Sequence, residues 1–283
     1  MFRWLKHLDW LLRGEATRPE ALRDGNVPVE TNGLAILLVL LGAIYGVCMG
    51  SFSLLKEVPP EIVDPNGRYL QLLATTIKVP TLFYLTLLVT FPSLYVFNAL
   101  VGSRLTVLSV LRLLIASLAV NLSVLASLGP IVLFFSLSTK SHAFIVLLNV
   151  AVFAVAGVLG LMFLLQTLHR LTTMEAERTT IARRRAADAA VESLAADDSN
   201  PPAEPSDRAE PGALDMPPGQ SLGRHTRLVF NCWVILFAVV GAQMGWVLRP
   251  FVGNPSLPFE WFRERQSNFF EAVLKTLSAL FGG

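Results

Sequence analysis

Acidic residues are missing from a long central part of the chain, since no Asp or Glu occurs between Pro65 and Met174. An ionised side chain at the centre of a bilayer costs at least ~2.5 kcal/mol, so membrane-spanning segments rarely carry carboxylates. The same stretch consists of long apolar runs, with Lys and Arg mainly near their ends. The absence excludes a soluble domain here and indicates transmembrane segments.

Charge is scarce in the whole chain, at 16% of residues, while 53% are hydrophobic and the mean hydropathy is +0.55. The net charge of +2 and the lack of a basic stripe with interleaved aromatics give no support to nucleic-acid binding. Period-two alternation, typical of outer-membrane strands, is also missing. We therefore predict an all-α polytopic transmembrane helix bundle, with the lipid bilayer as a partner and no nucleic acid.

Residues for catalysis are few. The two cysteines, Cys48 and Cys232, fall toward opposite ends of their spans, so we interpret them as buried, unpaired thiols. The four histidines, at positions 7, 142, 169 and 225, lack metal-ligand spacing. No nucleophile elbow, phosphate-binding loop or dinucleotide fingerprint occurs. The prediction is a protein that is not an enzyme and has no cofactor and no metal site.

Five apolar runs are long enough to cross a bilayer as helices, which takes about 20 residues. They extend over Leu34 to Leu55, Val79 to Val101, Leu105 to Phe135, Ala143 to Leu168 and Leu228 to Leu248. Basic residues concentrate before the first span, between the second and third, and between the fourth and fifth, which predicts a cytoplasmic N-terminus and an extracytoplasmic C-terminus. The chain then divides into a cytoplasmic segment 1–32, a four-span bundle 33–170, a cytoplasmic connection 171–226, a fifth span 227–249 and an extracytoplasmic segment 250–283.

Both ends of the chain are predicted to form amphipathic interfacial helices. Residues 2–12 place apolar side chains on one side of a helix that would lie in the headgroup layer, namely Phe2, Leu5, Leu8, Leu11 and Leu12. Near the other end, Asn268 precedes a helix as its N-cap, and Glu271 and Lys275 are spaced for an ion pair. The apolar side of that helix would carry Phe270, Val273, Leu274, Leu277 and Leu280.

The long fourth connection has two parts. The capping-box pattern from Thr172 to Glu175 predicts that a new helix starts there and continues to Asp197, and the Pro-rich residues 198–223 predict a flexible tether. The basic cluster of Arg183, Arg184 and Arg185 fits either docking to anionic lipid or an acidic partner, or a solvated helix face.

Small residues at every fourth position predict close helix packing within the spans, either inside one chain or between copies. These residues are Gly42, Gly46 and Gly50, then Ala156 and Gly160, then Gly241 and Gly245. The amides of Asn98, Asn121 and Gln243 would line a lumen or form interhelical hydrogen bonds. Pro92 and Pro130 are expected to kink or interrupt their helices.

After the last span, Arg249, Pro250, Gly253 and Pro255 predict a tight turn, and residues 258–264 predict one or two helical turns. The run from Gly245 to Pro255, with Pro258-Phe259 and Asn268 to Ala272, has the pattern W-x-L-R-P-F-[VI]-G-x-P and resembles a bacterial family of polytopic membrane proteins of uncharacterised function. This resemblance implies the bacterial cytoplasmic (inner) membrane. Members of that family carry the label of a WASP-homology actin-binding motif, matched here only by Leu274-Lys275-Thr276.

The five spans with an inner N-terminus and an outer C-terminus also resemble the Yip-domain membrane proteins in architecture, which implies a role in organising membranes and partner proteins. Two functions follow. The first is a non-catalytic membrane assembly protein, scaffold or accessory subunit that contacts a second copy or a membrane-protein partner. The second is an oligomeric channel or transporter for an anion or a neutral small solute, because carboxylates for cations are missing.

Overall fold

A computed structural model describes residues 2–15, 31–55, 66–100, 107–196, 223–254, 257–264 and 267–281. Within these ranges every regular element is an α-helix, which confirms the all-α prediction. The helices are α1 (Phe2–Leu12), α2 (Thr31–Leu55), α3 (Gly67–Leu100), α4 (Val107–Ser138), α5 (His142–Ala196), α6 (Gly223–Val247) and α7 (Phe269–Phe281).

Four of the helices are long and apolar enough to cross a membrane, through Gly33–Leu55, Gly67–Val96, Leu108–Ser138 and His142–Arg170. In the described residues, α6 has a shorter apolar stretch, Cys232–Val247. The prediction that the second span begins at Val79 is wrong, because α3 begins at Gly67. The twelve residues between these positions include polar side chains that the helix buries against the rest of the protein.

Pro92 and Pro130 were expected to kink or interrupt their helices, and neither proline interrupts its helix. Pro92 and Pro130 lie inside continuous helices, because neighbouring groups in a membrane helix can compensate for the backbone donor that proline removes. The predicted new helix at Thr172 is also wrong, because α5 continues without a break from His142 to Ala196. Its 55 residues correspond to roughly 80 Å at 1.5 Å per residue.

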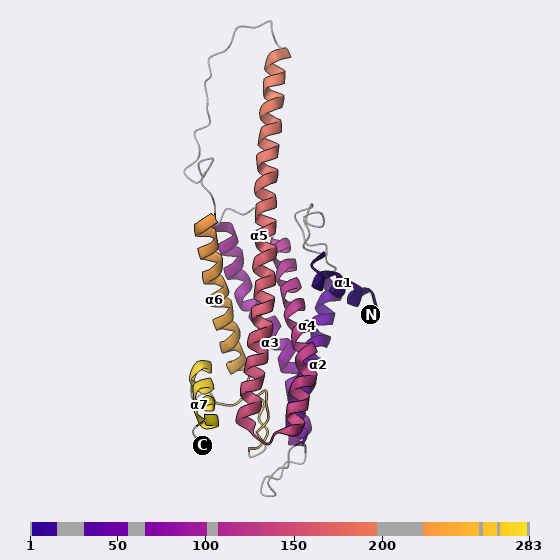
Figure 1. The fold of residues 1–283 in the computed structure, drawn as a ribbon, viewed down its shortest axis with the longest axis vertical. Coiled ribbons are helices and arrows are strands. Elements are labelled where there is room, and N and C mark those ends of the chain that lie inside the picture. The colour runs from indigo at the N-terminus through magenta and orange to yellow at the C-terminus, as the bar shows by residue number, and fades with distance from the viewer. Residues whose placement is uncertain are drawn as a thin grey trace.

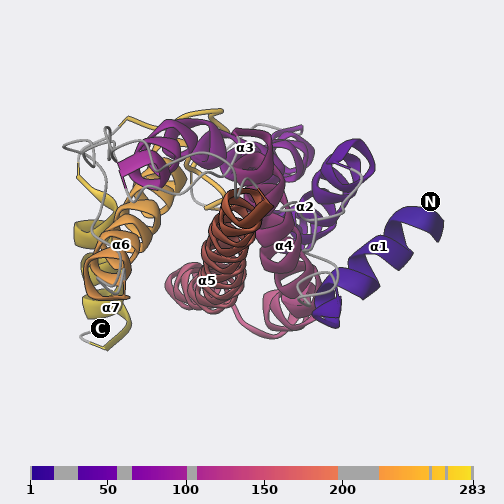
Figure 2. The ribbon, with the colours of Figure 1, turned by 90° about the horizontal axis from the view of Figure 1, so that it is seen from above.

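The helices form a bundle from which one end of α5 projects (Figure 1). We call residues 171–196 of α5 the arm, and the end of the bundle from which it extends the arm end. The C-terminal end of α3 and the N-terminal ends of α4 and α6 lie at the arm end, while α7 lies toward the opposite end (Figure 1). Helix α2 packs against α3 and α4, α4 against α5, and α3 against α6. Seen from above, α1 lies at one side of the bundle and α6 and α7 at the other (Figure 2).

Aromatic side chains fill the space between α2, α3 and α5. The ring of Phe153 on α5 meets Tyr45 on α2 edge to face at 5.4 Å and stacks on Phe83 of α3 at 6.0 Å, measured between ring centroids. Tyr45 is fully buried and Phe83 nearly so. This cluster joins three helices through their side chains and belongs to a single hydrophobic core.

Helix α1 has the bounds expected from the sequence and packs against α2 and α4. Leu8 and Leu11 are buried in the bundle core, whereas Leu5 and Leu12 are exposed. A Cβ placed on Gly33 of α2 would clash with the indole ring of Trp4, so glycine at this position lets the indole of α1 pack on α2. The apolar side of α1 is thus divided between the bundle and the exterior. The Phe2 side chain lies outside the described residues.

Candidate functional site

The glycine stripe of α2 lies directly on α3. A Cβ on Gly46 would come within 2.8 Å of the Thr75 carbonyl oxygen and of Thr76 Cα, and a Cβ on Gly42 would lie 3.1 Å from Pro80 Cα. A Cβ on Gly50 would similarly lie 3.2 Å from Leu72 Cα. The two backbones approach here as in other membrane helix pairs with small residues at the contact. This contact is within one chain.

The small residues of α5 are closely packed against another helix, whereas those of α6 are not. Ala156 is fully buried, and a Cβ on Gly160 would lie 2.9 Å from Asn121 Cβ, so α5 packs closely on α4. On α6, a Cβ on Gly241 would only touch Thr86 Cγ2 at 3.6 Å, and nothing lies within 4 Å of one on Gly245. The α6 pair therefore has no close backbone contact among the described residues of one chain, and its packing against a second copy stays a prediction.

Interhelical hydrogen bonds involve several buried polar groups. Tyr45 on α2 donates from its hydroxyl to Asn149 Oδ1 on α5 at 2.8 Å. Within α5, Asn149 Nδ2 donates to the Ile145 carbonyl at 2.8 Å. Ser117 donates to the Gly160 carbonyl at 2.7 Å, which links α4 to α5. Each of these direct hydrogen bonds satisfies a buried polar group of the core.

Two of the three predicted lumen amides lie on different helices. Asn121 is buried on α4, and its Oδ1 has no hydrogen-bond partner among the described residues. Gln243 is half-buried on α6, and the Asn98 side chain lies outside the described residues. Two of the three arginines of the basic cluster, Arg184 and Arg185, are exposed on the arm. The side chain of Arg183 lies outside the described residues.

The strongest polar site was not predicted, and it joins α3 to the chain that follows α6. We call the described residues between α6 and α7, 248–254, 257–264 and 267–268, the C-terminal segment. Gln71, Thr75 and Lys78 recur at i, i+4 and i+7 on α3, and all three side chains are buried. They lie on the side of α3 that contacts this segment.

Lys78 is the central residue of the site and is only 3% exposed. Its Nζ donates to the carbonyl oxygens of Pro250, at 3.2 Å, and of Trp261, and lies 5.0 Å from the centroid of the Phe262 ring. No carboxylate of the described residues forms an ion pair with it. The ammonium is therefore held by carbonyl dipoles and an aromatic face instead of by a counter-ion.

Two more side chains bind the segment. Gln71 Nε2 donates to the carbonyls of Phe251 at 3.0 Å and Pro250 at 3.3 Å, and Thr75 donates to the Phe251 carbonyl at 2.8 Å. A Cβ on Gly253 would lie 2.8 Å from Gln71 Cγ and 3.0 Å from Ser53 Cβ, so the segment passes close between α2 and α3. Irregular backbone beside membrane helices needs such donors, because lipid supplies none. We call Gln71, Thr75 and Lys78 the α3 latch.

The predicted turn residues have specific places around this latch. Arg249 Nη2 donates to the Glu264 carbonyl, and its guanidinium lies 3.9 Å from the centroid of the Trp246 ring. Pro250 is buried, as is Gly253, whereas Pro255 lies outside the described residues. The predicted helical turns at 258–264 are wrong, because that part of the segment has no regular secondary structure, and the Trp261 carbonyl within it accepts a hydrogen bond from α3.

The start of α7 follows the prediction. Asn268 Oδ1 accepts from the Glu271 amide at 2.9 Å, which is an N-cap, and Lys275 forms an ion pair with Glu271 at 2.7 Å. Helix α7 contacts α5 and α6. Phe270, Leu274 and Leu277 nevertheless stay exposed.

Cys48 and Cys232 form no disulfide, and Cys232 is exposed on α6, so the expectation that it is buried is wrong. No group of three or more potential metal ligands occurs in the part of the chain that the structure describes.

Comparisons of the chain with protein families, curated proteins and solved structures give no match.

Proposed function

We propose that this chain is a non-catalytic membrane protein that works as an assembly scaffold, with five membrane spans and a rigid arm on the cytoplasmic side. One observation carries the proposal: α5 is one uninterrupted helix that contains both a span, His142–Arg170, and the arm. The arm adds on the order of 40 Å beyond the span at 1.5 Å per residue. A partner bound to the arm would thus be held at a fixed distance and direction from the bundle.

The charge and exposure of the arm support this role. Ile181 is half exposed, and the neighbouring arginines Arg184 and Arg185 are exposed as well. The arm has no described helix beside it (Figure 1). An exposed helix with basic and apolar positions suits contact with an acidic partner surface or with a second copy of the chain.

The inside of the bundle also favours a scaffold over a pore. Tyr45, Phe83 and Phe153 occupy the space among α2, α3 and α5, and the Asn149 amide is used in a hydrogen bond between helices. A conducting path needs a continuous row of polar groups facing water.

The proposal has three further parts. The chain has five spans, α1 and α7 lie as amphipathic helices at the membrane interface, and the arm is cytoplasmic. Helix α6 packs against α3 and has 25 residues, which correspond to roughly 38 Å at 1.5 Å per residue, and its apolar part is Cys232–Val247. The positions of the helices agree with a cytoplasmic arm end, since α1 lies in the half of the bundle nearer the arm (Figure 1).

Site-specific photocrosslinking in intact membranes tests the role. A photoreactive amino acid is placed in turn at each position from 180 to 189, and crosslinked products are separated by mass. The proposal predicts products, either with a second copy or with one other protein, that recur with the 3.6-residue period of one helix face. Crosslinks with no period, or none, would contradict it.

Rotation of the arm provides a matched control. One alanine inserted after Arg170 turns the arm by about 100°, whereas seven alanines restore nearly the original direction while moving it about 10 Å outward. If α5 acts as a rigid rod, the single insertion moves the crosslinks to other positions of the arm and the seven-residue insertion largely preserves their pattern. Equal patterns in all three proteins would mean that the arm is flexible.

The alternative is an oligomeric channel or transporter for an anion or neutral solute, and one observation favours it. Helix α4 carries Arg112 Nε and Asn121 Oδ1, two buried polar atoms with no hydrogen-bond partner among the described residues. Buried polar atoms without a partner are rare in a closed bundle, and polar groups within membrane spans mark the ion or solute path in many channels and transporters. Chloride and glycerol flux into proteoliposomes that contain the purified protein decides the question. Flux above that of empty vesicles, and reduced in Asn121→Leu, would favour the channel over the scaffold.

A further inference from the structure

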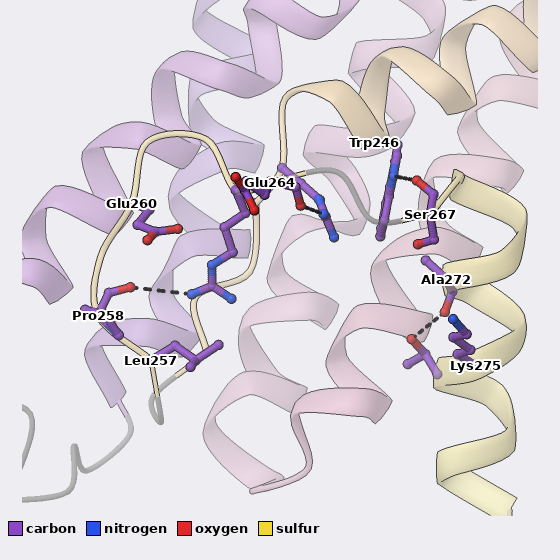
Figure 3. A pocket seen from close by; sticks show the side chains of 11 residues that line it. Trp246, Leu257, Pro258, Glu260, Glu264, Ser267, Ala272 and Lys275 are labelled. Atoms are coloured by element: carbon purple, nitrogen blue, oxygen red, sulfur yellow. Dashed lines mark hydrogen bonds between the residues drawn. The ribbon is translucent and has the colours of Figure 1, made fainter.

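A cavity of about 670 Å³ opens beside the α3 latch, between the end of α6, the C-terminal segment and α7 (Figure 3). Its size falls within the range of small-molecule sites, about 300–1,000 Å³. Trp246 forms one wall, Leu257 and Pro258 lie across from it, and Ala272 and Lys275 face it from α7 (Figure 3). The scaffold proposal makes no use of this cavity.

Charges of both signs line the cavity. Arg249, Arg263 and Lys275 are cationic, and Glu260 and Glu264 are anionic. In the described part of the chain, neither glutamate forms an ion pair, and Arg263 is held only by a long hydrogen bond of 3.5 Å to the Pro258 carbonyl. Lys275 is paired with Glu271, and Arg249 donates to the Glu264 carbonyl, so Arg263 and the two glutamates are the charges of the cavity that form no ion pair among the described residues.

The rim of the cavity is fixed by interactions that leave these charges in place. The Arg249 guanidinium is held against the Trp246 ring, Trp246 Nε1 donates to the Ser267 carbonyl, and the α3 latch holds the chain at Trp261. A site whose side chains are already ordered loses less conformational entropy when a ligand binds.

Apolar side chains lie next to this charged space. Phe262 and Leu274 are 61% and 65% exposed, and Trp261 and Phe270 are exposed as well. They belong to the C-terminal segment and to α7, the two elements that also form the cavity. A ligand that places both polar and apolar parts here must be an amphiphile.

From this arrangement we infer that the cavity binds the headgroup of a zwitterionic phospholipid with a primary ammonium, the phosphatidylethanolamine type. The phosphate is recognised by Arg263 and Arg249, and the ammonium by Glu260 and Glu264. The acyl chains lie along the exposed apolar side chains of α7 and the C-terminal segment. Both charges of the ligand are used, because a purely anionic headgroup would bring its negative charge close to the carboxylates of Glu260 and Glu264 with nothing to offset the repulsion.

Three fluorescent lipids with the same acyl chains test this inference on the full-length protein in detergent micelles. Phosphatidylethanolamine carries a primary ammonium, phosphatidylcholine a methylated one that cannot donate hydrogen bonds, and phosphatidylglycerol none. We expect phosphatidylethanolamine to bind about tenfold or more tightly than the other two, the effect of one charge-assisted hydrogen bond. Equal binding of the three lipids would overturn the inference.

Paired substitutions assign the two halves of the site. Glu260→Gln together with Glu264→Gln should remove the preference for phosphatidylethanolamine over phosphatidylcholine, whereas Arg263→Gln should weaken both lipids about equally. Lys140→Gln, which changes an exposed cation outside the cavity lining, should alter neither. Unchanged binding in both cavity variants, with circular dichroism and thermal unfolding like the parent protein, would overturn the assignment.

Soluble glycerophosphoethanolamine separates a lipid from a free phosphate compound. Failure to displace the fluorescent lipid at a large molar excess supports lipid recognition, and full displacement would mean that the headgroup alone is the ligand and would overturn the lipid assignment. This experiment is independent of the crosslinking experiment, so either proposal can fail without the other.

Discussion

Lys78 on α3 donates a hydrogen bond to the backbone carbonyl of Trp261, a residue 183 positions further along the chain. The contact places a buried ammonium of one membrane helix against a segment without regular secondary structure. Thr75, one turn away, and Gln71, two turns away, add further donors, so a single side of α3 satisfies the carbonyls of that segment. The order of the C-terminal segment therefore depends on α3.

Replacing Lys78 with Met should loosen the C-terminal segment while leaving the bundle folded. The change removes the donor for the Pro250 and Trp261 carbonyls, and a buried group left unsatisfied costs about 1–3 kcal/mol. Relief of the buried charge offsets part of this cost in the total free energy of unfolding. Hydrogen exchange followed by mass spectrometry should show faster exchange for residues 251–262, by roughly tenfold to a hundredfold.

Lys140→Met is the matched control, because it removes an exposed lysine outside the α3 latch. Its exchange pattern should equal that of the parent protein. If residues 251–262 of the Lys78→Met protein exchanged as slowly as in the parent protein, the α3 latch would not hold this part of the chain.

A methyl group at Gly46 should force α2 and α3 apart. The added Cβ would lie 2.8 Å from backbone atoms of Thr75 and Thr76, which cannot rotate away as a side chain can. We expect Gly46→Ala to lower the free energy of unfolding by about 1–3 kcal/mol, measured by circular dichroism during titration with sodium dodecyl sulfate in mixed micelles.

Gly157→Ala makes the same chemical change on α5, where nothing lies within 4 Å of the new Cβ. It should leave the stability unchanged or raise it by up to about 1 kcal/mol, because alanine favours the helix more than glycine does. Equal losses for the two variants would refute close packing as the reason for glycine at position 46.

The hydrogen bond from Tyr45 to Asn149 should contribute a measurable coupling between α2 and α5. Tyr45→Phe keeps the ring that contacts Phe153 and removes only the hydroxyl. A double-mutant cycle with Asn149→Leu should give a coupling free energy of about 0.6–1.7 kcal/mol, as for other hydrogen bonds between membrane helices. A coupling near zero, with Tyr95→Phe on the exposed side of α3 as the reference, would mean that the amide has another role.

Trp233 should be the main anchor of α6. Its side chain is 1% exposed, and its Nε1 donates to Ser93 Oγ on α3 at 3.1 Å. Trp233→Ala should cost about 3–5 kcal/mol and make α6 sensitive to protease in detergent micelles, because the large side chain leaves a cavity.

Ile235→Ala should have a much smaller effect, because Ile235 is mostly exposed on the same helix. The comparison separates packing against α3 from the general apolar character of α6. If both variants lost the same stability, α6 would depend on hydrophobicity alone and not on its contact with α3.

Local patterns were sufficient for several parts of the fold. The bounds of α1, the Asn268 cap of α7 and the ion pair between Glu271 and Lys275 follow from side chains within four residues of one another, and the structure has all three. Each involves contacts whose geometry a helix sets by itself. The failed prediction at Thr172 has the same origin, since a capping pattern cannot stop a helix that already continues from a span.

The α3 latch could have been suspected from the spacing of Gln71, Thr75 and Lys78, which puts three polar side chains on one helix side. The start of the span at Val79 hid this pattern, because a hydropathy window assigns polar residues before an apolar run to the connection. Only the partner of that side, the backbone near Pro250 and Trp261, explains why polar groups are buried there.

The sequence by itself determined that the chain is helical and apolar enough for a bilayer, because the solvation free energy of each segment depends on its own composition. It also determined which helices carry small residues for close packing. The tertiary structure decided which helix each stripe meets, that α5 continues into the arm, and that the segment after α6 returns to α3. These features depend on the pairing of residues far apart in the chain, and such pairs are set by shape and donor geometry that composition does not encode.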